Sequence, residues 1–145
     1  MTLYFAYGSN MDPKQVASRC PGAEAIGRAR LADHRLEFVW DSPGWGGGVG
    51  TVLAAPGDEV WGVLWELTQD DETSLDSYEG VSVGAYTKER VDLDADGESA
   101  NALVYIATDD RPKQPSARYM DALIRGARAF SLPPDYIERL RSLRA

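Results

Sequence analysis

Two short segments of the sequence carry residue types that could do chemistry together. The first is Tyr7-Gly8-Ser9-Asn10, which follows an extended apolar segment and precedes a helix expected to begin at Asp12-Pro13. A glycine at this place lets backbone N–H groups come close to a ligand, and the unpaired N–H groups of a helix start attract negative charge. Such a turn can hold a carboxylate or a developing oxyanion. An ordinary strand-to-helix turn is the commoner explanation of the tetrapeptide alone.

The second segment places Glu79 directly before Gly80, where a helix predicted over 70–78 must end. The helix dipole disfavours a carboxylate at that end. If the side chain is also partly buried, its pKa rises toward values that suit proton transfer. An exposed glutamate at a helix end is the more common case, so the position by itself leaves both interpretations open.

Two other segments resemble ligand-binding loops but lack a required residue. Residues 92–97 open like the calcium loop of an EF-hand, yet the glutamate due at position 103 is Leu103. Residues 46–51 resemble a phosphate loop, but no lysine follows the glycines and no strand precedes them. Cys20 and His34 are the single residues of their types, too few for a structural zinc site. We therefore expect no metal and no cofactor.

The elements that must position these segments alternate between strands and helices. Extended segments are expected over 2–7, 29–40, 51–55, 60–67, 86–93 and 102–108, and helices over 12–19, 70–78, 123–130 and from Pro133-Pro134 onward. The five glycines of segment 41–50 predict a mobile loop, and Pro56-Gly57-Asp58 predicts a turn. Thr68 and Asp71 resemble a capping box. This order predicts one α+β domain over residues 1–145, with a mixed curved sheet or small β-barrel and flanking helices.

The composition narrows the classes of function. A net charge of -8 argues against nucleic acid and acidic membranes as partners, because phosphate contacts need clustered Lys and Arg. Arg139, Arg141 and Arg144 are spaced like the polar face of an amphipathic helix. No apolar stretch approaches the roughly 20 residues that span a bilayer, and the first residues lack the pattern of a signal peptide. We expect a cytoplasmic protein, and the excess of Arg over Lys suggests a bacterial source.

Four sequence blocks, in register, resemble the γ-glutamylcyclotransferase family. They are Leu3–Asn10, Gly57–Val63, Ser74-Leu75-Asp76 with Glu79-Gly80-Val81, and Pro115-Ser116 with Tyr119. The blocks cover nearly the whole chain, with Leu132-Pro133 and Tyr136 following late in the sequence. Because four blocks in order are far more specific than one, they favour the functional interpretation of the turn and of Glu79.

The resemblance implies an enzyme that converts a γ-glutamyl compound into 5-oxoproline and a free amino acid or amine. In this reaction the α-amine of the substrate attacks its own δ-carbonyl, and Glu79 is implied to be the catalytic acid/base. The resemblance also implies a set of substrate-binding residues: Tyr4, Phe5, Ala6, Tyr7, Gly8, Ser9, Asn10, Tyr86, Tyr105 and Tyr119. The expected partner is a small γ-glutamyl substrate, and the animal enzymes of this type suggest a homodimer.

The Gly-Ser-Asn ending of the turn resembles the general branch of the family, so we expect a γ-glutamyl amino acid to be preferred over glutathione. Segment 44–50 is neutral, and Arg111 and Lys113 are the candidate cations for a terminal carboxylate. Two alternatives stay open: removal of a γ-glutamyl protecting group from a biosynthetic intermediate, and a non-catalytic binding or interaction domain. Glu79 argues against the second, because a pure binder gains little from a buried carboxylate.

Overall fold

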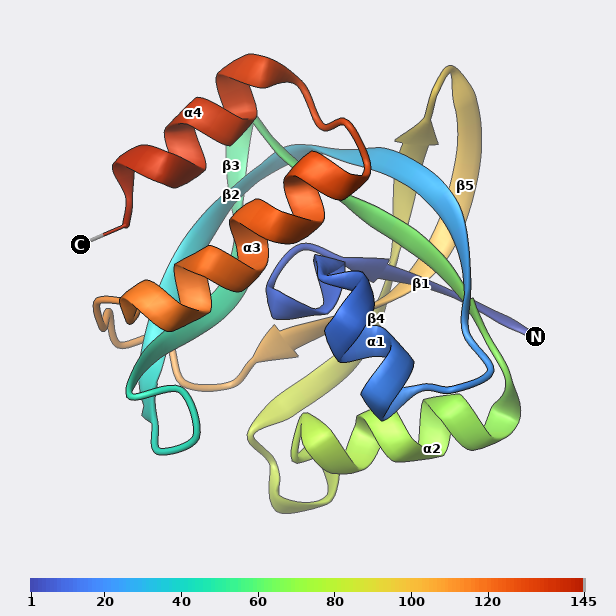
Figure 1. Cartoon of the computed structure of the whole chain (residues 1–145), viewed down its shortest axis with the longest axis horizontal. Helices are drawn as coiled ribbons and strands as arrows, with labels where there is room; N and C mark the ends of the chain where they lie inside the picture. Colours follow the sequence, from blue (N-terminus) through green and yellow to red (C-terminus); the bar gives the residue numbers. More distant parts are fainter. Residues whose placement is uncertain (145) are drawn as a thin grey trace.

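A closed five-stranded β-barrel forms the centre of the computed structural model, which describes residues 1–144 (Figure 1). The strands are β1 (Thr2–Ala6), β2 (Glu24–Ser42), β3 (Gly47–Leu67), β4 (Tyr86–Ala95) and β5 (Glu98–Ala107). Their order around the barrel is β1-β3-β2-β4-β5, and neighbours are antiparallel except for the parallel contact between β1 and β5 that pairs Tyr4 with Leu103. The predicted α+β class, with a small barrel and flanking helices, is confirmed.

Helices pack against the outside of this barrel. They are η1 (Ser9–Met11), α1 (Pro13–Arg19), α2 (Gln69–Tyr78), η2 (Val81–Val83), α3 (Ala117–Ala129) and α4 (Pro134–Ser142). Asp12 caps α1 by accepting a hydrogen bond from the Lys14 N–H, and Thr68 and Asp71 form the predicted capping box of α2. In Figure 1, α1 and α2 lie next to each other, while α3 and α4 cover a different part of the barrel. No helix in the described part of the chain is long and apolar enough to cross a membrane.

The predicted mobile loop over 41–50 is wrong for most of its length. Ser42 ends β2 and Gly47 begins β3, so these strands form a long hairpin with a short turn between them. Val39 pairs with Val49, and Ser42 pairs with Gly47. Glycine suits this strand because the chain at 113 lies close against it: an added Cβ at Gly48 would stand 2.0 Å from the Lys113 carbonyl oxygen. The glycines therefore allow close packing of backbone rather than mobility.

The turn predicted at Pro56-Gly57-Asp58 is instead a bulge within β3. The β2–β3 register shifts here between Ala32 and His34, and the strand then continues to Leu67. Gly57 has a positive φ of 87°, and its N–H donates to the Asp33 carboxylate at 3.0 Å. Pairing with β2 on both sides of the bulge outweighs the local turn preference of the Pro-Gly-Asp sequence.

Two apolar clusters divide the core, and β1 separates them. Because successive strand residues point to opposite faces, Phe5 contributes to the cluster inside the barrel and Tyr4 to the cluster beneath the helices. The inner cluster comprises Phe5, Tyr7, Ala29, Leu31, Val52, Val60, Leu64, Leu93, Ala102 and Val104. In the outer cluster α3 packs so tightly on η1 that a Cβ at Gly126 would lie 2.4 Å from the Met11 Cβ. This contact fixes α3 against the turn that follows β1.

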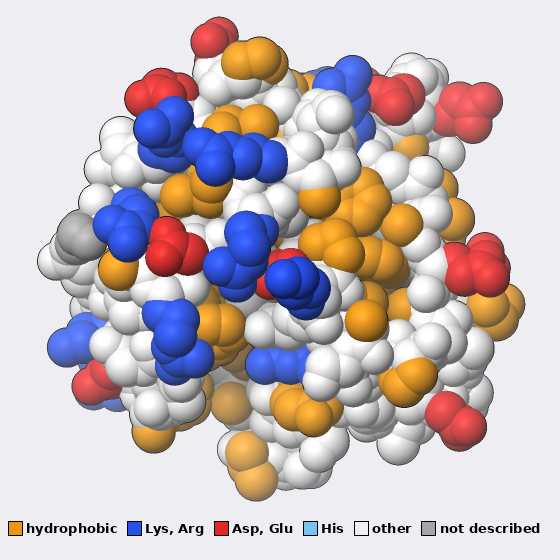
Figure 2. All heavy atoms as spheres, in the orientation of Figure 1, with side chains coloured by type: hydrophobic (Ala, Val, Ile, Leu, Met, Phe, Trp, Pro, Cys, Tyr) orange, Lys and Arg blue, Asp and Glu red, His pale blue; other side chains and the backbone are white. Residues whose placement is uncertain are grey.

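Basic side chains are prominent on one part of the face shown in Figure 2. Lys and Arg side chains gather on the face over α3 and α4 (Figure 2), although the chain as a whole carries a net charge of -8. Tyr136 and Leu140 of α4 are buried, whereas Arg139 and Arg141 are exposed. The amphipathic pattern predicted for this helix is confirmed.

Candidate active site

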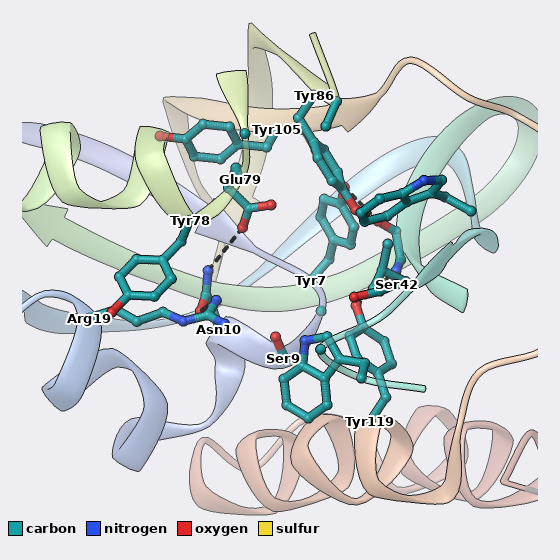
Figure 3. Close-up of a pocket in the computed structure, with 18 of the residues that line it drawn as sticks. Tyr7, Ser9, Asn10, Arg19, Ser42, Tyr78, Glu79, Tyr86, Tyr105 and Tyr119 are labelled. Carbon is teal, nitrogen blue, oxygen red and sulfur yellow. Dashed lines mark hydrogen bonds between the residues drawn. The ribbon is translucent and has the colours of Figure 1, made fainter. Parts of the chain in front are cut away.

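A cavity of about 360 Å³ opens where the turn after β1, the tip of the β2–β3 hairpin, the end of α2 and the start of α3 meet (Figure 3). Most of the site residues predicted from the sequence line it: Tyr4, Tyr7, Gly8, Ser9, Asn10, Glu79, Tyr86, Tyr105 and Tyr119. The fold therefore brings together residues from the first tenth of the chain, its middle and its last third. The volume falls within the range of about 300–1,000 Å³ that is typical of small-molecule sites.

Two residues of the predicted binding segment lie away from the cavity. Phe5 is fully buried inside the barrel, because the alternation of β1 turns it away from Tyr4. Ala6 is buried beneath the helices, and its carbonyl oxygen would stand 2.3 Å from a Cβ added at Gly62. Both residues pack β1 into place, so the structure assigns them no contact with a ligand in the cavity.

Glu79 reaches the cavity from the C-terminal end of α2. Its backbone N–H donates to the Leu75 carbonyl at 2.9 Å, which completes the last turn of the helix. Gly80 then has a positive φ of 67°, a conformation that glycine adopts at little cost and that directs the chain away from the helix. The Glu79 side chain is half-buried and points into the cavity, where Oε1 accepts a hydrogen bond from Asn10 Nδ2 at 3.3 Å (Figure 3).

Burial raises the pKa of Glu79 from 4.5 to about 7, and the nearby Arg19 guanidinium partly opposes this rise. The cause is removal of the carboxylate from water, which disfavours its charged form. The sequence alone pointed first to the helix dipole, whereas burial dominates in the folded protein. A carboxyl group with a pKa near neutrality can both accept and return a proton under physiological conditions.

The Asn10 side chain is oriented by contacts on both sides of its amide. The Oδ1 atom accepts hydrogen bonds from Gln15 Nε2 at 2.9 Å and from Arg19 Nη1 at 3.2 Å. The backbone oxygen of Asn10 accepts a further bond from Trp65 Nε1 at 3.1 Å. Because the amide oxygen is occupied by donors, the amide NH₂ is the group that faces Glu79.

Tyrosine hydroxyls line the opposite wall and are held by the β2–β3 hairpin. Tyr119 Oη accepts a hydrogen bond from the Gly50 N–H at 2.8 Å, and Tyr86 Oη donates to the Gly50 carbonyl at 2.9 Å. A Cβ at Gly8 would lie 2.7 Å from the Tyr119 hydroxyl, so glycine is needed for this close approach. Burial raises the pKa of Tyr7, Tyr86 and Tyr119, and these hydroxyls stay protonated at neutral pH.

Several lining residues were missed by sequence reasoning. The hairpin supplies Trp40, Ser42 and Trp45, and the Trp45 ring meets the Tyr119 ring edge-on with centroids 5.1 Å apart. Arg19, the last residue of α1, also lines the cavity, and its guanidinium carbon lies 4.6 Å from the centroid of the Tyr78 ring. An aromatic residue within a glycine-rich segment is the sequence signal for the wall formed by the hairpin, although the glycines themselves predict a mobile loop.

The cations suggested for a terminal carboxylate do not line the cavity. Arg111 pairs with Asp109 at 2.6 Å, and its side chain is 85% exposed. Lys113 lies 4.0 Å from Asp41 at the surface. The specificity hypothesis based on Arg111 and Lys113 therefore has no support from their positions.

The described residues offer no cluster of metal ligands. Within residues 1–144, no group of three or more His, Cys, Asp or Glu side chains could hold a metal ion. The calcium-like segment at 92–97 belongs to the β4–β5 hairpin, where the Asp94 carboxylate accepts a bond from the Gly97 N–H at 2.7 Å. Asp94 therefore stabilises the hairpin turn through this hydrogen bond.

A half-buried carboxyl group with a raised pKa, inside a cavity of small-molecule size, is an arrangement suited to acid/base chemistry on a small polar compound. Comparison with known proteins gives the family. The AIG2-like family matches residues 59–140. The human γ-glutamylcyclotransferase is 37% identical over 147 residues, covering 97% of this chain and 78% of the human protein. The mouse γ-glutamylcyclotransferase is 36% identical over 146 residues, with the same coverage of both chains.

A solved structure of a γ-glutamyl cyclotransferase superposes with a TM-score of 0.94 and 36% sequence identity, covering 97% of this chain and 86% of that chain. The chain therefore belongs to the γ-glutamylcyclotransferase family, as the four sequence blocks predicted. It is an enzyme of this kind.

Proposed function

We propose that Glu79 is the acid/base with which this enzyme releases 5-oxoproline from γ-glutamyl amino acids. Family membership supports the type of reaction. The observation that carries the residue assignment is the Glu79 carboxylate, which points into the cavity and accepts a hydrogen bond from Asn10 of the turn. One cavity thus contains both a proton carrier and the segment proposed to hold the glutamyl group.

Positioning supplies much of the catalysis in this proposal. The nucleophile and the electrophile belong to one molecule, so the protein has to fold the glutamyl chain until its α-amine approaches its δ-carbonyl carbon. Such positioning can contribute on the order of 7–11 kcal/mol to lowering a barrier. The Gly8-Ser9 backbone and the Tyr119 hydroxyl form one wall for the bent chain.

Proton transfer is assigned to Glu79 in both halves of the reaction. Its carboxylate takes a proton from the α-amine as the new C–N bond forms at the δ-carbon. The resulting carboxylic acid then gives the proton to the departing nitrogen as the old C–N bond breaks, so Glu79 ends in its starting state. A pKa of about 7 suits both transfers, because neither form of the group is strongly favoured at neutral pH.

In the tetrahedral intermediate the δ-carbon is bonded to both nitrogens, and its oxygen carries a negative charge. Hydrogen-bond donors are needed to stabilise that charge. The backbone turn at Gly8 and Ser9 and the Tyr119 hydroxyl are the uncharged donors that line the cavity near this position. Burial raises the pKa of Tyr119, so its hydroxyl keeps its proton and can donate. Preorganised donors of this kind typically contribute about 10²–10³ in kcat each.

The experiment is an assay of 5-oxoproline with the purified protein and a panel of γ-glutamyl dipeptides, γ-glutamylamines and glutathione. We expect turnover of γ-glutamyl dipeptides, unchanged by EDTA, and a lower kcat/KM for glutathione than for γ-glutamyl-alanine. Absence of 5-oxoproline from the whole panel would contradict the proposal. A higher kcat/KM for glutathione would contradict the branch assigned from the Gly-Ser-Asn turn.

A further inference from the structure

Arg19 is the cation of the cavity. Among the lining residues within the described chain it is the single Lys or Arg, and Glu79 is the single carboxylate. Within residues 1–144, Arg19 forms no ion pair; Arg90, Arg118, Arg128 and Arg139 form none either, but none of them lines the cavity. A charged group facing a cavity without an acidic partner can pair with a ligand.

Neutral contacts hold Arg19 in place. Its guanidinium carbon lies 4.6 Å from the centroid of the Tyr78 ring, and Nη1 donates to Asn10 Oδ1 at 3.2 Å. The Arg19 carbonyl accepts a bond from Ser74 Oγ at 2.8 Å, which ties the end of α1 to α2. The guanidinium has five N–H donors, and the Asn10 contact uses one of them. Donors in the planar fork remain for a carboxylate.

The arrangement around Glu79 suggests which carboxylate would bind. In the view of Figure 3, Arg19 and Tyr78 lie on one side of the Glu79 carboxylate, and Ser9 and Tyr119 lie on the other. A γ-glutamyl amino acid carries two carboxylates, one on each side of the amide bond that breaks. If the glutamyl half occupies the Ser9 side, as the proposed function requires, the leaving half extends toward Arg19.

We propose that Arg19 binds the carboxylate of the leaving amino acid and thereby selects γ-glutamyl amino acids over γ-glutamyl amines. This inference rests on the proposed function. A γ-glutamyl amine places no charge opposite the guanidinium, so Arg19 stays unpaired in that complex. Tyr78 supports the selection, because its ring covers one face of the guanidinium and limits its rotation.

The test compares two substrates that differ only in that carboxylate: γ-glutamyl-alanine and γ-glutamyl-ethylamine. For the wild-type enzyme we expect kcat/KM to be about 10- to 100-fold higher for γ-glutamyl-alanine, the range of a charge-assisted hydrogen bond. In Arg19→Met this ratio falls to near one, and in Arg19→Lys it is intermediate. Loss of the Asn10 contact lowers turnover of both substrates alike, so it cancels in the ratio.

Lys14→Met is the matched control, because Lys14 lies on the same helix, is exposed and does not line the cavity. It should keep the wild-type ratio. Equal kcat/KM for the two substrates in the wild-type enzyme would overturn the assignment, and this result needs no variant to fold. An unchanged ratio in a folded Arg19→Met would overturn it as well. Failure of the wild-type enzyme to form 5-oxoproline from either substrate would instead contradict the proposed function.

Discussion

Asn10 Nδ2 and Glu79 Oε1 lie 3.3 Å apart, although the two residues are 69 positions apart in the sequence. Their hydrogen bond connects the turn after β1 with the end of α2, the two segments whose chemistry stood out in the sequence. Asn10 donates to the charged carboxylate, and burial opposes that charge. Burial raises the pKa of the Glu79 carboxyl group to about 7, and the Arg19 guanidinium partly offsets this rise.

The pH dependence of turnover should follow the Glu79 carboxyl group. The ionised form is the one that accepts the proton of the α-amine, and burial raises the pKa of this group to about 7. We therefore expect kcat/KM to fall about tenfold per pH unit below pH 7. Initial rates at low substrate concentration, measured from pH 5 to pH 8, give this limb directly. A profile that stays flat down to pH 5 would exclude a raised pKa in the free enzyme.

The same carboxyl group should make stability depend on pH. Its pKa is 4.5 when unperturbed and about 7 in the folded protein, so the folded state holds more protons between these values. Stability is therefore lost as pH rises through this window, by up to about 3 kcal/mol. Glu79→Gln removes this loss, so urea unfolding should find it more stable than wild type at pH 8 and similar at pH 4. The same difference at both pH values would show that the carboxyl group does not titrate in this way.

The close contact between Gly8 and Tyr119 should appear as coupling between two substitutions. In Gly8→Ala the new Cβ stands 2.7 Å from the Tyr119 hydroxyl, and relief of this overlap costs about 1–3 kcal/mol. Tyr119→Phe removes the hydroxyl and leaves Cζ at 3.8 Å, an ordinary contact distance. A double-mutant cycle should find Gly8→Ala less destabilising in the Tyr119→Phe background. If the destabilising effects of the two substitutions simply add, the overlap must be relieved in another way, by movement of the turn at Gly8 away from α3.

A charged network should stabilise the wall behind Tyr105. Tyr105 Oη donates to Asp76 at 2.6 Å, and Lys88 Nζ donates to Asp76 at 3.0 Å and to Glu72 at 2.6 Å. Lys88→Met leaves these half-buried acids without a cation, so we expect a loss of about 1–3 kcal/mol at pH 7. The surface pair of Lys113 with Asp41 at 4.0 Å is the control, and Lys113→Met should cost close to nothing.

Acid should reduce the effect of Lys88→Met. The hydrogen bond from Lys88 lowers the pKa of Glu72 below 4.5. This stabilisation is complete above pH 4.5 and disappears as the pH falls through the lowered pKa. Unfolding free energies of wild type and variant should therefore converge in strong acid. A difference in unfolding free energy that stays constant with pH would attribute the loss to packing of the aliphatic part of the Lys88 side chain.

The sequence predicted much of the site, because each chemically important segment ends a regular element. Residues that end a strand or a helix mark both the turn after β1 and the position of Glu79 at the end of α2. The family resemblance implies the tyrosines of the site. The resemblance over 4–10 implies that Phe5 contacts the substrate, but strand alternation turns Phe5 into the inside of the barrel. A continuous sequence block does not imply that every member faces the same side.

The remaining parts depended on contacts between segments far apart in the chain. Glycines at 47–50 looked mobile, but pairing with β2 and close packing against the chain near 113 order them as a strand. Trp45 and Arg19 reach the cavity only because this hairpin and α1 fold toward it. The aromatic residue within the glycine-rich segment hints at the role of Trp45, but nothing in the local sequence indicates that of Arg19, which arises from tertiary packing.

The most direct test of the account is 5-oxoproline formation by Glu79→Gln. Gln keeps the size of the side chain and can still accept the Asn10 hydrogen bond, but it cannot take a proton. We expect a folded protein whose kcat is lower by about 10²–10⁴-fold. Glu89→Gln, an exposed change on β4 outside the cavity, should retain wild-type turnover. A Glu79→Gln enzyme with near-wild-type kcat would contradict the assignment of Glu79 as the acid/base.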